Sequence, residues 1–402
     1  MLLFNCPEKC LLTVISLTVT ICTMCDHATC LESSKQIKLF GYPLETYQVW
    51  TRDNYLLGLE RIPHHGKHGA NGIIGKPVLL LHGLYLSSAI FTLNNSSLSF
   101  VLSDAGFDVW LFNARGVGLS RTLSIYNGPG SPARMNKISW DFSFHEMGVY
   151  DMTSTIDFVL KKTGYSKLDV LGYSLGTTIA LTCLSERPEY NLKINKLILM
   201  APTSRLKSAG MPIGLFRQFS KIINVLLYGF NFMPYTEDPD TTYDLIRRMC
   251  TNKNVFMACR TFIDLAQGIS LPMNNDTILN IVSLFPQPMS TKTLRHMLQL
   301  LTHGSFRHYD YGPYGNLLRY HSITPSNYDL SKITAPTFII HSKNDTLVPP
   351  EDVKWLISQL PNIKDVYYID KIPWGHLSFS LSPIMKQVVN SYIANILLNY
   401  NA

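Results

Sequence analysis

Short apolar runs alternate along this chain with longer stretches in which apolar residues recur at helical spacing. The short runs are typical of buried strands, and the longer stretches are typical of helices that cover a sheet. Strands are expected at Pro77–Leu81, Phe107–Phe112, Leu168–Leu171, Lys196–Met200, Thr337–His341 and Val366–Ile369. Helices are expected at Leu98–Asp104, Phe144–Lys162, Ser174–Glu186, Pro350–Leu360 and Pro383–Leu398. The alternation predicts an α/β fold with a mostly parallel central sheet and helices on both faces.

Two segments depart from this rhythm. Near the start, the runs Tyr47–Trp50 and Tyr55–Ile62 flank a polar turn, which predicts an antiparallel hairpin. Later, apolar helical stretches such as Met211–Tyr228 are interrupted by proline and glycine. Arg217 and Lys221 inside that stretch favour amphipathic helices over a membrane span. We therefore expect a core made of residues 31–202 and 327–402, with residues 203–326 inserted as a mainly helical cap.

The first thirty residues have the pattern of a secretory signal. Lys9 precedes the apolar run Leu11–Cys25, and small or polar residues follow it. The run is shorter than the roughly 18 to 20 residues that span a bilayer, so an uncleaved anchor is the weaker alternative. We expect residues 1–30 to be a signal peptide that is cleaved between Cys25 and Cys30. The mature chain would then be secreted, to an extracellular space or a lysosome, without a transmembrane span.

Cleavage would change the set of cysteines that the mature chain retains. Five of the eight cysteines lie in the signal segment, at Cys6, Cys10, Cys22, Cys25 and Cys30. Of the others, only Cys250 and Cys259 are close enough in sequence to suggest a local disulfide in an oxidising compartment. Two buried thiols are the alternative for this pair. Cys183 is expected to be a packed thiol.

The charged residues exclude one class of function. The formal net charge of +7 is modest for 402 residues, and the chain has no clustered basic run or basic-aromatic stripe. Nucleic acid binding is therefore not expected. The His64–His68 run lacks cysteine or carboxylate partners at ligand spacing, so we interpret it as a solvated loop and not as a metal site.

The sharpest chemical signal is Gly172-Tyr173-Ser174-Leu175-Gly176, a G-x-S-x-G sequence between an expected strand and an expected helix. Glycines are required where backbones pass closely, and the serine at such a turn is held in a strained conformation that exposes its hydroxyl. The start of the following helix favours negative charge that develops beside it. A chance pentapeptide is the alternative, but the strand-to-helix context weighs against it. Ser174 is the candidate nucleophile.

A serine hydroxyl needs a base within hydrogen-bond reach and a carboxylate that orients the base. Asp345 follows the strand Thr337–His341 as the candidate acid, and His376 follows Val366–Ile369 as the candidate general base. Both fall at the carboxyl edge of the sheet, where α/β proteins place reactive groups. The less well placed competitors are Asp352, Asp365, Asp370, His321 and His341.

A transition-state oxyanion would need backbone donors near Ser174. His82 and Gly83 directly follow the strand Pro77–Leu81, where this type of fold supplies one such donor. We expect the N–H groups of Leu84 and Leu175 to form the oxyanion hole. A tight turn is the alternative role for His82 and Gly83, and both roles can hold together.

With these residues placed, the chain resembles the animal acid lipase family of the α/β-hydrolase superfamily, which includes gastric and lysosomal acid lipases and invertebrate lipases. The resemblance extends from Gly41 to Leu377. The patterns that carry it are Tyr55–Pro63, Asn94–Leu98, Ala105–Leu111, Tyr150–Asp151 and Thr155–Phe158, in that order.

The resemblance implies an α/β-hydrolase fold with a cap over the site. It also implies hydrolysis of triacylglycerols, cholesteryl esters or related lipid esters at a lipid–water interface, without a metal or organic cofactor. By position it assigns Ser174, Asp345 and His376 to the triad. The family typically has His and Gln where this chain has Tyr173 and Leu175, so a different substrate preference or pH response is expected. One family cysteine upstream of Cys250 is absent, and the family's disulfide is therefore not carried over.

Secretion would make some N-glycosylation sequons usable. The sequons lie at Asn94, Asn95, Asn275 and Asn344. We expect Asn94 and Asn95 not to be modified together, and we expect Asn344 to be unmodified because a glycan there would crowd Asp345. An ordinary polar turn is the alternative at each position.

Three functions fit these residues. The leading one is a secreted lipase whose apolar cap contacts lipid; a soluble short-chain carboxylesterase and a non-catalytic lipid-binding protein of the same fold are the alternatives. Activity on emulsified long-chain triacylglycerol, compared with a short-chain ester, separates the first two. Loss of ester hydrolysis in Ser174→Ala would exclude the third.

Overall fold

The computed structural model describes residues 33–63, 75–121, 140–211, 213–220, 222–223, 248–250, 252–273, 275, 277–278 and 285–400. The expected signal peptide, residues 1–30, lies outside the described residues, as do the His64–His68 run and the end of the stretch Met211–Tyr228.

Eight strands form one central sheet in the order β1-β2-β4-β3-β5-β6-β7-β8. Their bounds are β1 Glu45–Trp50, β2 Leu56–Ile62, β3 Pro77–Leu81, β4 Asp108–Phe112, β5 Leu168–Tyr173, β6 Ile194–Met200, β7 Thr337–Ser342 and β8 Ile363–Ile369. β1 and β2 form the expected antiparallel hairpin, and β2 also pairs antiparallel with β4. The other neighbouring strands pair in parallel, which confirms the mostly parallel sheet.

The central strands are buried along their whole length, which explains why they read as continuous apolar runs. Successive residues of a strand point to opposite faces of the sheet. In β3, Leu79 and Leu81 therefore enter one hydrophobic core, whereas Val78 and Leu80 enter a second one on the other face.

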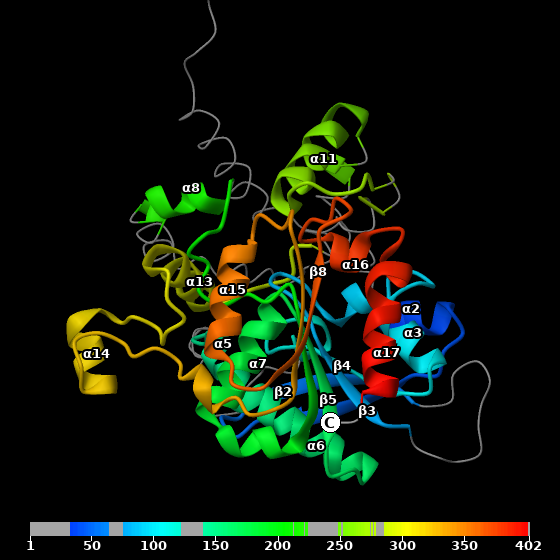
Figure 1. Ribbon diagram of the computed structural model, residues 1–402, viewed down its shortest axis with the longest axis horizontal. Helices are drawn as coiled ribbons and strands as arrows, with labels where there is room; N and C mark the ends of the chain where they lie inside the picture. Colours follow the sequence, from blue (N-terminus) through cyan, green and yellow to red (C-terminus); the bar gives the residue numbers. More distant parts are fainter. Residues whose placement is uncertain are drawn as a thin grey trace, which may run out of the picture.

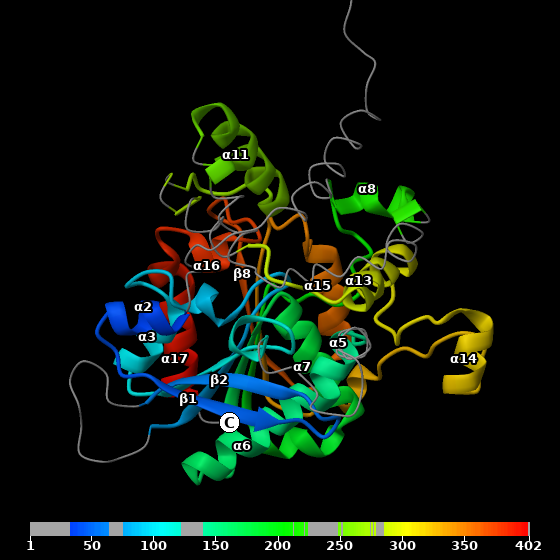
Figure 2. The same ribbon diagram turned by 180° about the vertical axis from the view of Figure 1, so that it is seen from behind.

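Helices cover both faces of the sheet (Figures 1 and 2). The core around Leu79 includes side chains from the first group of helices: α5 Phe144–Glu146, α6 Thr153–Thr163, α7 Leu175–Glu186 and α15 Pro350–Gln359. The core around Val78 includes the second group: α2 Ser33–Leu39, α3 Leu98–Asp104, α16 Ser378–Leu381 and α17 Ser391–Asn399.

Two of the expected helices are interrupted by π-helical turns. Phe144–Lys162 was expected to be one helix, but the π turn Met147–Met152 separates α5 from α6. Another π turn, Lys386–Asn390, precedes α17 within the segment expected as the last helix. Apolar periodicity did not reveal the first π turn, because the residues that it buries, Met147, Gly148, Asp151 and Met152, still recur at spacings of three and four.

The helices α8 (Ile213–Gln218), α11 (Lys253–Gln267), α13 (Thr291–His303) and α14 (Gly312–Tyr320) lie in the chain between β6 and β7. In Figure 1, α8 and α11 lie above the sheet, and α14 projects to one side. The cap boundaries at 203 and 326 stay a prediction.

The cysteines among the described residues fall into two groups. A disulfide joins Cys250 to Cys259 across the start of α11, and the free thiol of Cys183 is buried in α7. Among the helices that the structure describes, none is long and apolar enough to cross a bilayer.

Candidate active site

Ser174 lies at a sharp turn between the end of β5 and the start of α7. Its backbone has φ 53° and ψ −115°, a strained conformation for a residue with a side chain. The flanking glycines permit this turn. A Cβ on Gly172 would come within 2.7 Å of the backbone of Gly176, and a Cβ on Gly176 would come within 2.2 Å of the Leu81 carbonyl oxygen. The two glycines are therefore required by close backbone approach.

The fold brings together the three residues that the sequence selected. His376 Nε2 lies 2.9 Å from Ser174 Oγ, and His376 Nδ1 lies 2.7 Å from Asp345 Oδ2. The other carboxylate oxygen, Oδ1, accepts hydrogen bonds from the N–H groups of Leu347 and Val348 at 3.0 and 2.8 Å. Since Asp345 accepts at both oxygens, Nδ1 of His376 is the donor, and Nε2 is left to accept the hydroxyl proton of Ser174.

All three side chains are withdrawn from water. The exposed fraction is 5% for Ser174, 5% for His376 and 2% for Asp345. In such surroundings a hydrogen bond between an imidazole and a carboxylate is stronger than it is in water. The arrangement can transfer a proton from the hydroxyl to the imidazole while the carboxylate stabilises the resulting positive charge.

The competing acids and bases have other partners. Asp352, on α15, accepts hydrogen bonds from Arg205 and from the backbone of Ser208. His341 lies within β7, where its ring stacks on Tyr368 and burial lowers its pKa to about 4. Three further competitors lie in exposed positions, at Asp365, Asp370 and His321.

The turn after β3 lies against Ser174. A Cβ on Gly83 would lie 3.4 Å from the Cβ of Ser174. Among the hydrogen bonds of the described residues, the N–H groups of Leu84 and Leu175 have no protein acceptor. Both groups are therefore free to donate to a bound oxygen atom.

His82 fixes this turn from behind. Its Nδ1 donates to the carbonyl of Gly83 at 2.9 Å, and its Nε2 accepts from the N–H of Ala114 at 3.2 Å. The ring is fully buried, and burial lowers its pKa to about 4. His82 is therefore neutral and holds the loop after β3 against the loop after β4. The sequence suggested a tight turn here but gave no sign of the second contact.

Tyr173 holds the other side of the site. Its hydroxyl donates to the backbone carbonyl of His376 at 2.9 Å, and its ring stacks on the imidazole with centroids 5.7 Å apart. Two serines also bind the loop that carries the base. The hydroxyl of Ser342 donates to the carbonyl of Trp374, and the hydroxyl of Ser378 accepts from the N–H of Gly375. Sequence reasoning missed both serines, because a serine in a loop carries no pattern of its own.

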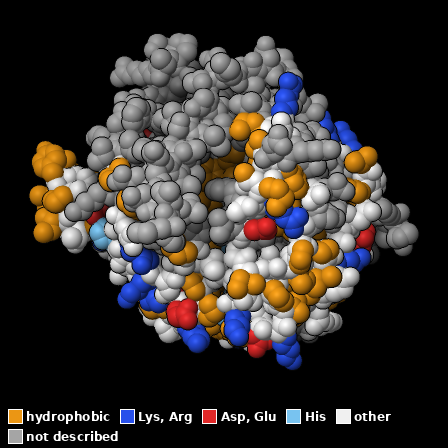
Figure 3. Space-filling view, turned by 90° about the horizontal axis from the view of Figure 1, so that it is seen from above, with side chains coloured by type: hydrophobic (Ala, Val, Ile, Leu, Met, Phe, Trp, Pro, Cys, Tyr) orange, Lys and Arg blue, Asp and Glu red, His pale blue; other side chains and the backbone are white. Residues whose placement is uncertain are grey.

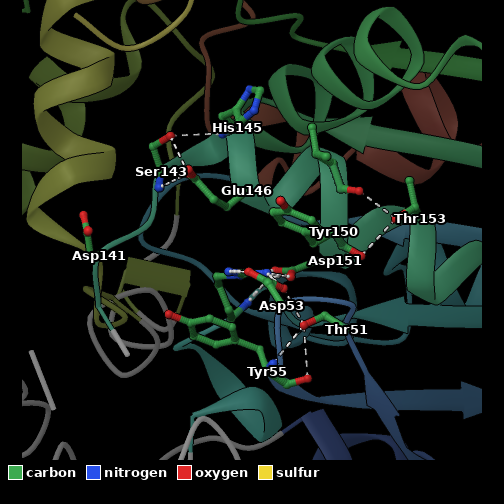
Figure 4. A network of polar contacts seen from close by, with 12 residues as sticks. Thr51, Asp53, Tyr55, Asp141, Ser143, His145, Glu146, Tyr150, Asp151 and Thr153 are labelled. Atoms are coloured by element: carbon green, nitrogen blue, oxygen red, sulfur yellow. Dashed lines mark hydrogen bonds and ion pairs between the residues drawn. The ribbon is translucent and has the colours of Figure 1, made fainter. Parts of the chain in front are cut away.

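A buried ion-pair network anchors the loop after β4. The Arg115 guanidinium binds Asp151 and Asp53, with contacts from 2.5 to 3.1 Å, and lies over the ring of Tyr55. Figure 4 shows Asp53, Asp151 and Tyr55 converging on this point. Arg115 is 1% exposed, so the network ties the hairpin and the π turn to the loop that His82 also contacts.

The chain between β6 and β7 presents apolar side chains to solvent. Large apolar residues with at least a third of their surface exposed lie at Met211, Leu215, Phe216, Phe219, Ile222, Met257 and Ile269. Figure 3 shows the upper face of the molecule, where hydrophobic side chains gather around a hollow. Clustered exposure of this kind marks a surface that contacts a partner or a lipid phase.

Comparisons with known proteins agree with this fold. A family model described as the alpha/beta hydrolase fold matches residues 76–383, and a partial alpha/beta-hydrolase lipase region matches residues 33–95. The gastric triacylglycerol lipase of Mus musculus is 35% identical over 352 residues, which cover 86% of each chain. Human lipase member N is 34% identical over 359 residues, which cover 87% of this chain and 86% of that one.

The chain belongs to the lipase family of the α/β hydrolases. A solved structure from Burkholderia cenocepacia, described as a candidate aryl esterase, has a TM-score of 0.51 at 15% identity and covers 88% of this chain and 98% of that one, which shows the shared fold alone.

Proposed function

We propose that this protein is a secreted lipase that hydrolyses lipid esters, either triacylglycerols or sterol esters, through an acyl-enzyme on Ser174. The observation that carries the proposal is the hydrogen-bonded chain from Ser174 Oγ through His376 to Asp345. Membership of the lipase family supports the lipid substrate.

The first half of the reaction transfers the acyl group to the serine. Ser174 Oγ attacks the ester carbonyl carbon while its proton moves to His376 Nε2, and Asp345 stabilises the imidazolium at Nδ1. The carbonyl oxygen becomes an oxyanion that accepts hydrogen bonds from the N–H groups of Leu84 and Leu175. When this intermediate collapses, the bond to the alcohol oxygen breaks and His376 donates its proton to that oxygen. The alcohol leaves, and the acyl group stays esterified to Ser174.

The second half regenerates the enzyme with water. A water molecule gives a proton to His376 Nε2 as its oxygen attacks the acyl carbon, and the same two N–H groups stabilise the oxyanion. The bond to Ser174 Oγ then breaks, and the serine takes back the proton from His376. The carboxylic acid leaves. Loss of one oxyanion donor typically slows such reactions by about 10² to 10³.

The exposed side chains of the proposed cap favour lipid over dispersed esters as the substrate. Exposed apolar side chains on α8 and in the segment around α11 lose contact with water when they enter a lipid surface. Each fully transferred large side chain contributes about 1.5 to 3 kcal/mol. The same surface would deliver the ester to the candidate site.

The sequence supports secretion. Residues 1–30 have the signal pattern, with cleavage between Cys25 and Cys30. The disulfide between Cys250 and Cys259 fits an oxidising compartment. The glycosylation candidates Asn94, Asn95 and Asn275 are exposed. N-terminal sequencing of the secreted protein would locate the cleavage site.

Substrate comparison tests the proposal. Purified protein should hydrolyse emulsified long-chain triacylglycerol or sterol ester faster than a dissolved short-chain ester, and Ser174→Ala should abolish both activities. Hydrolysis of the short-chain ester alone would instead identify a carboxylesterase. Lipid binding without any hydrolysis by the unaltered protein would identify a non-catalytic protein of this fold.

A further inference from the structure

A second cluster of chemically reactive side chains lies apart from Ser174. His145 lies on α5, Glu186 is the last residue of α7, and His308 follows α13. Each residue offers one ligand atom, a ring nitrogen from each histidine and a carboxylate oxygen from Glu186. These three atoms lie within 4.8 Å of one another. The closest pair is His308 Nε2 and Glu186 Oε2, at 3.1 Å. All three residues are partly exposed; the side chain of His308 is 13% exposed and that of Glu186 is 28% exposed.

Neighbouring groups orient both imidazoles. His308 Nδ1 donates to the backbone carbonyl of Ser326 at 2.9 Å, which leaves Nε2 directed at Glu186. His145 Nδ1 pairs with the hydroxyl of Tyr328 at 3.0 Å, and the Tyr328 ring packs against both imidazoles. A histidine that binds a metal almost always has its second nitrogen held in this way by a carbonyl or another polar group.

The set of donor atoms suits zinc. Two imidazoles and one carboxylate with an open fourth position are a common Zn²⁺ ligand set, whereas Mg²⁺ and Ca²⁺ prefer oxygen ligands alone. With Zn–N and Zn–O bonds of roughly 2.0 to 2.2 Å, two ligand atoms on a tetrahedral ion lie about 3.4 Å apart. The 3.1 Å between His308 Nε2 and Glu186 Oε2 is close to that separation.

We propose that His145, Glu186 and His308 form a zinc-binding site whose fourth position is open to water. The site would tie the chain after α13 to helices α5 and α7 of the core. Figure 4 shows His145 pointing away from Asp53 and Asp151, so the zinc site would be separate from the buried ion-pair network. No metal site was expected from the sequence, because the three ligands come from distant segments and form no local motif.

Equilibrium dialysis tests the site. The purified protein, stripped of metal and dialysed against micromolar Zn²⁺, should retain about one Zn²⁺ per chain. His145→Ala, Glu186→Gln and His308→Ala should each weaken binding by at least about tenfold, since loss of even an outer partner typically costs 10- to 100-fold. His303→Ala, which removes an exposed histidine at the end of α13, should bind as the unaltered protein does. Absence of stoichiometric binding, or binding unchanged in the three variants, would overturn the proposal and leave Glu186 and His308 as an ion pair only.

A measurement on the unaltered protein guards against variants that fail to fold. X-ray absorption at the zinc edge should show two imidazole ligands together with oxygen ligands. A spectrum with oxygen ligands alone, or with one imidazole, would contradict the assignment. Zn²⁺ should also raise the unfolding temperature of the unaltered protein, because the ion binds only the folded arrangement.

Discussion

The hydroxyl of Tyr173 donates a hydrogen bond of 2.9 Å to the backbone carbonyl of His376. The residue before the candidate nucleophile thus holds the loop that carries the candidate base, and stacking of the two rings adds a second constraint. Tyr173 is buried and does not reach the reacting atoms itself. It is a positioning residue in the proposed reaction.

Tyr173→Phe should therefore lower kcat for a soluble ester by about tenfold, equivalent to about 1.4 kcal/mol, with little change in KM. The ring stays in place, but the His376 loop loses its hydrogen bond. Steady-state kinetics would measure the effect. Tyr190→Phe is the matched control, because its hydroxyl donates to Asp157, away from the His376 loop. A Tyr173→Phe enzyme with normal kcat, or with a raised KM alone, would show that the bond does not position the base.

Gly176→Ala should destabilise the fold by about 3 kcal/mol, because the new Cβ would lie 2.2 Å from the Leu81 carbonyl oxygen in the packed sheet. Gly164→Ala is the control. Gly164 has φ +76° but open space around it, so its substitution should cost only about 1 kcal/mol of backbone strain. Urea unfolding of both variants would compare the two costs. Equal losses would mean that the turn tolerates a side chain.

Arg115→Met should reduce the free energy of unfolding by about 3 to 5 kcal/mol, because it leaves the buried Asp151 carboxylate without its cation. Lys332→Ala removes an exposed pair with Asp329 at 3.9 Å and should cost less than about 1 kcal/mol. Urea unfolding near neutral pH is the appropriate measurement. If Arg115→Met were as stable as the control, the network would not anchor the loop after β4.

The catalytic candidates were predictable because each lies just past an apolar strand. The positions of the expected strands and the order of the residues along the chain were enough to select Ser174, Asp345 and His376. The residues that hold these three side chains in place could not be predicted from the sequence. Arg115 meets Asp53 and Asp151 across long stretches of sequence, and His82 reaches Ala114 on another loop. Such contacts depend on how the loops pack in the folded chain, and the local pattern of apolar residues does not predict how loops pack.

The π turns and the cluster of His145, Glu186 and His308 could not be predicted from the sequence, for a related reason. The residues buried in the π turn Met147–Met152 recur at spacings of three and four, so the sequence pattern looks like that of one continuous helix. His145, Glu186 and His308 are polar residues of three separate segments that only the folded chain brings together. The sheet, by contrast, follows directly from its apolar runs.

Stability should fall as the pH is lowered below about 6.5. Burial lowers the pKa of His296 from 6.5 to about 3, and its ring stacks on Phe144. Because the folded pKa is depressed, the unfolded chain takes up a proton first, and stability is lost from about pH 6.5 down to about pH 3. His296 alone should account for about 2 kcal/mol between about pH 6.5 and 4.5.

Burial acts in the same direction at His82 and His341, whose pKa values are each lowered to about 4. His296→Gln cannot take up the proton, so its free energy of unfolding should fall by about 2 kcal/mol less than that of the unaltered protein over the same interval. Urea unfolding at both pH values gives the two differences. Parallel losses in both proteins would rule out His296 as a source of acid sensitivity.

In the proposed reaction, folding activates the Ser174 hydroxyl against His376. Labelling with a serine-directed phosphonate ester, followed by peptide mapping, detects this activation, because only an activated hydroxyl reacts quickly with such a reagent. We expect one label per chain, on the peptide that contains Ser174, and no label in Ser174→Ala. A label on any other residue, or equal labelling of the Ser174→Ala variant, would show that Ser174 is not the activated hydroxyl.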